Sequence, residues 1–322
     1  MYGSRLARRT YTYRLIIATA ASFCAPVAQL QTLSRDDDTL RQMVSEIKSA
    51  DAAFFQAFSG RDLWAMGRLW AKTDYVSAIH PARATPFLNW DAVRMSWKQT
   101  FAHNRNIKLH QRAGSLHIAG DIAWIIDSTR FEAIQTQTGQ PILMNNILAT
   151  KIFEKHGHKW LLVHYHAHLP KFATRSHAHG TVPVPAAVPK LPHDVKQADD
   201  SFSKAFIQRD IAAMSQVWEE ADEVSAIHPD YPAPFLGWRN VRVSWQQTFD
   251  YSRDIRLDTR VWHYHSVGPV VWIIESAQFD AVQTQTHQPI RLQNVLTTKI
   301  FEKTPHRWTL VHFHAHRGPT VQ

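Results

Sequence analysis

The chain contains one structural unit twice, and the two copies are related by a constant offset. Ile79-His80-Pro81 returns as Ile227-His228-Pro229, so the offset is 228 − 80 = 148 residues. No gap is needed from Asp51 and its counterpart Asp199 to the final histidine of each copy. This self-similarity predicts two domains of the same fold, since a unit of this length can bury a core of its own.

The first 34 residues have the pattern of a secretory signal. Arginines at positions 5, 8, 9 and 14 precede an apolar stretch, 15–25, that is too short to span a bilayer comfortably. The single cysteine, Cys24, lies in this stretch, so we expect the mature chain to have no disulfide and no thiolate metal site. The sequence therefore predicts a periplasmic or secreted protein that is not attached to a membrane once the signal is removed.

Charge argues against a nucleic-acid partner. The formal net charge is +9, and removing residues 1–28 deletes four arginines and no acid, which leaves 9 − 4 = +5. No Lys/Arg cluster of the kind that follows a phosphate backbone occurs in the chain. Lys171 to Lys190 is rich in proline and alanine, as in a semi-rigid linker. We predict a leader at 1–34, domains at 35–170 and 192–318, and a linker at 171–191.

Each copy changes its hydrophobic period partway along. Apolar residues at helical spacing predict a long first helix, a short second helix after Asp62 or Asp210 as N-cap, and a third helix within 87–101 or 235–249. From residue 107, and again from residue 255, the period is two, as in a meander of antiparallel strands. The predicted fold class is α+β, with about three N-terminal helices packed on a curved, mainly antiparallel sheet.

These motifs resemble the SnoaL-like and DUF4440-like domains of the nuclear transport factor 2-like superfamily. The resemblance rests on Arg61-Asp62 before the second helix, on Trp70, on the third-helix pattern from Trp90 to Trp97, and on an ending of Trp-x-x-Val-His-x-His-Ala in both copies. It implies cone-shaped domains with a pocket at the open end. Because such domains commonly pair through their sheets, it also implies an intramolecular pseudo-dimer of the two repeats.

The closing segments, Trp160–His168 and Trp308–His316, carry three histidines each at alternate positions. On a strand, all three imidazoles of a copy share one face. His166 and His314 are predicted acid/base catalysts. The first expectation is that the protein has no cofactor, and a zinc site is the alternative. The candidate metal ligands are His164, His166, His168, His312, His314 and His316.

A carboxylate follows the same Trp-Ile-Ile in both copies and is the second candidate. Asp127 and Glu275 share a strand face with apolar residues, so a raised pKa and a role as general base are expected. The alternative is a structural ion pair with Arg94 or Arg242, which both copies keep.

The remaining candidates are polar or aromatic side chains that both copies share and that could contact a ligand inside the cone. The predicted ligand-binding residues are His164, His168, His312, His316, Asn146, Asn294, Thr150, Thr298, Trp97, Trp245, Arg94 and Arg242. The structural alternatives are core packing for the tryptophans and contacts within the strand ladder for the asparagines and threonines.

Three functions stay open. The first is binding of a small organic molecule in each pocket, with or without acid/base turnover, so the sequence leaves open whether the protein is an enzyme. The second is carbonic anhydrase activity, since His164 to His168 resembles the His-His-His-Ser-Ser ending of the iota class. Only the first and third histidines of that motif match. The third is a non-enzymatic periplasmic binding or assembly module.

Overall fold

The structure, a computed structural model, describes residues 35–81, 83–170 and 189–319. The predicted leader and most of the predicted linker lie outside these ranges. The elements of the first domain are α1 (Arg35–Gly60), α2 (Leu63–Leu69), β1 (Ser77–Ile79), β2 (Phe87–Leu88), α3 (Trp90–His103), β3 (Asn104–Ala119), β4 (Ile122–Gln135), β5 (Pro141–His156) and β6 (Lys159–His168).

The second domain repeats this order element by element. Its elements are α4 (His193–Gln208), α5 (Ile211–Val217), β7 (Ser225–Ile227), β8 (Phe235–Leu236), α6 (Trp238–Tyr251), β9 (Ser252–Val267), β10 (Val270–Gln283), β11 (Pro289–Lys303) and β12 (Trp308–Arg317). The sheets have the orders β2-β1-β6-β5-β4-β3 and β8-β7-β12-β11-β10-β9. Among the strand pairs of these two sheets, β1–β6 and β7–β12 are parallel and the others are antiparallel. The predicted α+β class, with helices on a mainly antiparallel sheet, is confirmed.

Local chemistry explains where the helices begin. The Asp62 carboxylate accepts from the backbone N–H groups of Trp64 and Ala65, at 3.0 and 2.8 Å, and so caps α2. Asp210 caps α5 in the same way. The sequence predicts both residues as N-caps, and the structure agrees.

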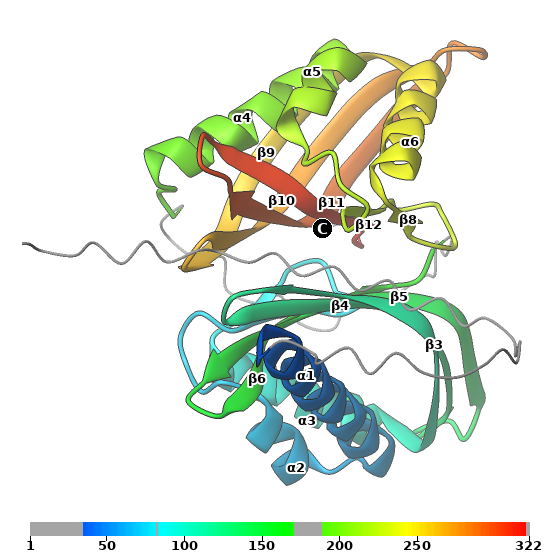
Figure 1. The fold of residues 1–322 in the computed structure, drawn as a ribbon. Coiled ribbons are helices and arrows are strands. Elements are labelled where there is room, and N and C mark those ends of the chain that lie inside the picture. Colours follow the sequence, from blue (N-terminus) through cyan, green and yellow to red (C-terminus); the bar gives the residue numbers. More distant parts are fainter. Residues whose placement is uncertain (1–34, 82, 171–188, 320–322) are drawn as a thin grey trace, which may run out of the picture.

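The helices of each domain cover the face of its sheet that is turned away from the other domain (Figure 1). The core of the first domain lies between these two layers, where Phe54 and Phe58 of α1 meet Trp97 of α3 with ring centroids 5.5 and 5.2 Å apart. Trp97 and its counterpart Trp245 are buried core residues, as the structural alternative for the tryptophans predicted.

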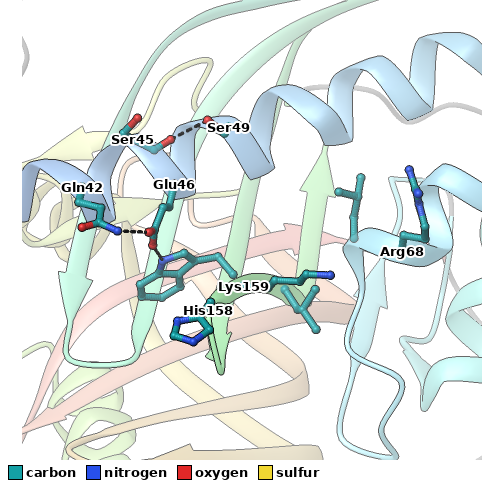
Figure 2. Close-up of a pocket in the computed structure, with 10 residues that line it drawn as sticks. Gln42, Ser45, Glu46, Ser49, Arg68, His158 and Lys159 are labelled. Carbon is teal, nitrogen blue, oxygen red and sulfur yellow. Dashed lines mark hydrogen bonds between the residues drawn. The ribbon is translucent and has the colours of Figure 1, made fainter.

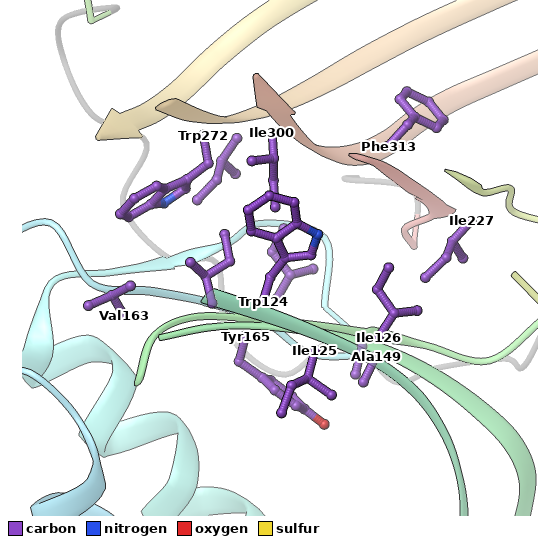
Figure 3. Close-up of a cluster of buried hydrophobic side chains, with 14 of the residues drawn as sticks. Trp124, Ile125, Ile126, Ala149, Val163, Tyr165, Ile227, Trp272, Ile300 and Phe313 are labelled. Atoms are coloured by element: carbon purple, nitrogen blue, oxygen red, sulfur yellow. The ribbon is translucent and has the colours of Figure 1, made fainter. Parts of the chain in front are cut away.

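The other faces of the two sheets lie against each other. Figure 3 shows Trp124 and Trp272 between the sheets, whereas Tyr165 points to the opposite side of the first sheet. Both faces of β6 and β12 are thus covered, one by helices and one by the other domain, and these strands are buried along most of their length. No helix among the described residues is long and apolar enough to cross a membrane.

Candidate functional site

Alternation along two neighbouring strands separates the candidate residues into two sites. On β6, the side chains of His164, His166 and His168 face the second domain, and Thr150 does so on β5. Tyr165, between the first two histidines, faces the helices of its own domain and lines a cavity there. The predicted shared face of the histidines is therefore present, but it is not the face that lines the cavity.

Between the domains, the six histidines form two hydrogen-bonded chains with serine and threonine hydroxyls. One chain runs Ser77 Oγ, His164, Thr298 Oγ1, His166 and His316, with successive distances of 2.8, 2.9, 2.8 and 2.8 Å. The other runs Ser225 Oγ, His312, Thr150 Oγ1, His314 and His168, with the same four distances. The rings of His166 and His314 stack at the centre, with centroids 3.6 Å apart.

The environment keeps these imidazoles neutral. Burial lowers the pKa of His164, His312 and His316 to about 3, and neighbouring histidines add to the effect at His164. Burial likewise holds the pKa values of His166, His168 and His314 well below the ordinary value. Among the described residues, no group of three or more His, Cys, Asp or Glu side chains is arranged to hold a metal ion. The network couples the domains and does not reach the cavity.

The cavity of the first domain has a volume of about 350 Å³ and lies between the helices and the sheet. Its walls are mostly aromatic and aliphatic, with a few polar groups among them. The aromatic lining consists of Phe54, Phe55, Phe58, Phe87, Phe131 and Tyr165. The polar lining includes His80, Arg83, His103, Asp127, Thr129 and Lys151.

Asp127 is part of a buried ionic cluster in this cavity. Its Oδ2 lies 2.6 Å from Lys151 Nζ and accepts from Gln111 Nε2 at 3.1 Å. The same ammonium group donates to Asp51. In the second domain, Lys299 contacts Glu275 at 2.7 Å and Asp199 at 2.5 Å. Burial raises the pKa of Asp127 above the ordinary value, although Lys151 opposes the shift, and it raises the pKa of Glu275 to about 8.

The alternative prediction, an ion pair of these carboxylates with Arg94 or Arg242, was wrong. Arg94 and Arg242 are exposed on α3 and α6, so they contact neither the carboxylates nor the cavity. The cation that pairs with the carboxylate is a lysine in both domains. The strands β5 and β11 lie beside β4 and β10, and Lys151 and Lys299 point to the same sheet face as Asp127 and Glu275. A signal was present in the sequence, where both copies keep a lysine within an apolar strand.

Two further polar residues line the cavity: Tyr165, which was not predicted, and His80, which the sequence suggests only as a possible third ligand of a metal site. The Tyr165 hydroxyl makes no hydrogen bond within the described part of the chain, and burial and Asp127 raise its pKa, so it is a neutral donor. His80 Nε2 lies 3.0 Å from Ser96 Oγ, and burial lowers its pKa to about 3. Tyr165 is replaced by Phe313 in the second copy, and Thr129, 3.5 Å from Asp127, by Ala277.

The two asparagine candidates are not cavity residues either. Asn146 has a left-handed backbone, φ 59°, and its Oδ1 accepts from Arg112 Nη1 at 2.8 Å. Asn294 Nδ2 donates to the carbonyls of Ala84 and Pro319, at 2.8 and 3.0 Å, and so bridges the domains.

A second hollow lies on the surface beside α1 (Figure 2). Glu46 accepts there from Trp160 Nε1 at 3.2 Å and from Gln42 Nε2 at 2.8 Å. Trp308 donates to Asp194 at the matching place of the second domain. These contacts fasten the first helix of each domain to its last strand, which is a structural role.

Each half of the molecule is thus an α+β cone, and the first encloses a cavity with an acidic group at its wall. The family model described as a SnoaL-like domain matches residues 47–170 and 195–315, and the chain belongs to this family. The predicted family is confirmed.

A curated relative is the F-box protein SKIP8 of Arabidopsis thaliana, 31% identical over 121 residues, or 38% of this chain and 48% of that protein. The chain therefore spans about half the length of that relative. Similar solved structures include an NTF2-like protein from Pseudomonas putida, with 20% identity, a TM-score of 0.36 and coverage of 44% of this chain and 97% of that one. Another is an NTF2-like superfamily protein from Salmonella enterica, with 17% identity, a TM-score of 0.36 and coverage of 40% and 91%.

Proposed function

We propose that the first domain binds a small, mainly apolar organic molecule in its cavity and that Asp127 exchanges a proton with it. SnoaL-like domains commonly bind small molecules or act as isomerases. The observation that carries the proposal is the enclosure of a carboxyl and a phenol hydroxyl by aromatic walls, in a cavity of about 350 Å³. Ligand pockets usually combine apolar walls with few polar groups in this way.

The polar groups have separable roles. Burial raises the Asp127 pKa above its ordinary value, and a carboxylate with a raised pKa is a better proton acceptor. Lys151 holds this carboxylate in place at 2.6 Å. The Tyr165 hydroxyl is free to donate a hydrogen bond to a ligand oxygen. The ligand class that fits is a ring compound carrying a carbonyl or hydroxyl oxygen.

Carbonic anhydrase activity receives less support. The histidines that match the iota-class ending, His164 and His166, face the second domain and are bonded at both ring nitrogens. A zinc cofactor would have to displace those bonds. His166 and His314 are accordingly proposed as interface residues, and the proton carrier of the cavity is the carboxylate.

We also propose that the duplication supplies within one chain the sheet-to-sheet pairing that separate subunits would otherwise provide, as an intramolecular pseudo-dimer. Export remains part of the proposal and rests on residues 1–34 of the sequence. Cell fractionation with N-terminal sequencing of the mature protein tests export, and uncleaved protein retained in the cytoplasm would contradict it.

Ligand binding is tested with the full-length protein and 2-naphthol as the probe, followed by NMR after native mass spectrometry has checked for a co-purified molecule. Tyr165→Phe should weaken binding roughly two- to tenfold, the effect of one hydrogen bond. The second copy already has phenylalanine at this position, so the variant should fold. Tyr251→Phe, at an exposed tyrosine, is the matched control. Equal binding by both variants would contradict the role of Tyr165, and no binding of any ring compound would contradict the function.

A further inference from the structure

The two hydrogen-bonded chains between the domains each end on an imidazole nitrogen without a partner. Ten of the twelve ring nitrogens of the six interface histidines are hydrogen-bonded. The other two, His168 Nε2 and His316 Nε2, have no partner within the described residues. The two residues are 1% and 2% exposed. Two equivalent orphan nitrogens, one from each domain, call for a physical explanation.

The serine at the start of each chain fixes the direction of its hydrogen bonds. The Ser77 hydroxyl has His164 Nδ1 as its one hydrogen-bond partner among the described residues. If this nitrogen carried the proton, the buried O–H would have no acceptor, at a cost of about 1–3 kcal/mol. The Ser77 backbone also contacts this ring and favours a proton on it. From the buried hydroxyl we infer that Ser77 donates and that His164 carries its proton on Nε2. The same reasoning applies to Ser225 and His312.

The proton positions of the remaining members follow in turn. His164 Nε2–H donates to Thr298 Oγ1, and the Thr298 hydroxyl donates to His166 Nδ1. His166 Nε2–H then donates to His316 Nδ1, which leaves the proton of His316 on Nε2. All six histidines are thus Nε2–H tautomers, and both orphan nitrogens are donors. A metal ion would need lone pairs at these positions, which this proton order does not offer.

Geometry and polarity favour an acceptor beside these donors. The rings of His168 and His316 are nearly parallel, with centroids 5.7 Å apart, whereas those of the inner pair, His166 and His314, lie 3.6 Å apart. The cluster is therefore wider at its outer end. Each chain consists of four hydrogen bonds aligned towards that end, and aligned hydrogen bonds polarise one another. Both chains consequently place partial positive charge at the outer N–H groups.

We propose that His168 and His316 together bind one small anion, of the size of chloride or formate, through their Nε2–H groups at the domain interface. The ligand accepts one hydrogen bond from each domain and so links the two cones at the outer end of the cluster.

The test uses ¹⁵N-labelled full-length protein. Long-range ¹H–¹⁵N spectra should show Nε2–H tautomers for all six histidines. Titration with sodium formate from a formate- and chloride-free buffer should shift the Nε2–H signals of His168 and His316 saturably, with a Kd on the order of 1 mM. Nδ1–H tautomers would overturn the proposal and favour a metal site. Absence of a saturable shift would overturn it too, and would leave water as the occupant.

A matched pair of variants gives a second readout. His168→Gln removes one of the two ring donors and should weaken formate binding on the order of tenfold. His110→Gln, at an exposed histidine of β3, should leave it unchanged. Equal affinities for the two variants would contradict the site. The tautomer measurement on the unmodified protein remains decisive if His168→Gln does not fold.

Discussion

Lys151 shows how much one buried residue can determine. Its ammonium group is almost fully buried and contacts both Asp51 and Asp127, so it is the cation that neutralises two carboxylates at once. Its ammonium also lies 4.3 Å from the centre of the Phe55 ring. Removing the charge would leave two acids close together in a poorly solvated place. The cluster thus holds α1 to the sheet and sets the proton affinity of the cavity acid.

Lys151→Met should destabilise the first domain by about 3–5 kcal/mol, because it leaves uncompensated buried charge. Denaturant unfolding of the full-length protein measures this. Lys98→Met, at an exposed lysine of α3, is the control and should change stability by less than about 0.5 kcal/mol. Asp127→Asn in the Lys151→Met background should recover part of the loss, and a loss no larger than that of the control would contradict the cluster's role.

At the scale of one element, β11 shows that two adjacent threonines can face opposite sides of a sheet and contribute differently to stability. Thr298 faces the first domain and bonds His164 and His166, at 2.9 and 2.8 Å. Thr297 faces the other way, and its buried hydroxyl has no partner among the described residues. Successive side chains of a strand alternate between faces, so this contrast is built into the backbone.

Thr298→Val should therefore destabilise the protein by about 2–4 kcal/mol, since it leaves one imidazole donor and one imidazole acceptor unpaired. Thr297→Val is the matched control, identical in chemistry and one residue away. It should be neutral or slightly stabilising, because the hydroxyl it removes is unsatisfied. Thermal unfolding of both variants measures the difference, and similar losses would mean that the histidine network contributes little.

For the whole molecule, the histidines make the contact between the domains sensitive to acid. Burial lowers the pKa of His164, His312 and His316 from 6.5 to about 3. In each of the six imidazoles, Nδ1 accepts a hydrogen bond and Nε2 already carries a proton. A second proton must therefore go to Nδ1 and break the hydrogen bond that this nitrogen accepts. Other titratable groups at the interface include His117, which contacts Glu302 at 2.6 Å, and His263, whose pKa burial also lowers. His265 stacks on Tyr75 across the interface, and burial lowers its pKa to about 4.

The docked state binds fewer protons than separated domains, so docking is favoured above pH 6.5 and is lost as the pH falls from 6.5 towards 3. Each histidine weakens docking by up to about tenfold per pH unit in this range. Small-angle X-ray scattering and the fluorescence of Trp124 and Trp272 should report separation before either cone unfolds. His110→Ala should not move the midpoint, and a docking equilibrium that is flat down to pH 3 would contradict the interpretation.

The sequence alone determined the duplication, the α+β class, the family and the order of elements, since periodicity, caps and repeats are local patterns. It also determined that the three histidines of each copy share a strand face. Which face that is was decided by tertiary structure. All seven residues of β6 from Leu162 to His168 are buried, because helices cover one side of the sheet and the other domain covers the other.

Because both faces of β6 are buried, its hydrophobic pattern does not indicate which face lines the cavity and which lies at the domain interface. The histidines, Thr150 and Thr298 consequently lie between the domains, while Tyr165 and Lys151, their immediate neighbours in the chain, line the cavity. The partner of Asp127 was decided in the same way. It depends on which strand lies beside β4, and only the assembled sheet brings Lys151 to the carboxylate.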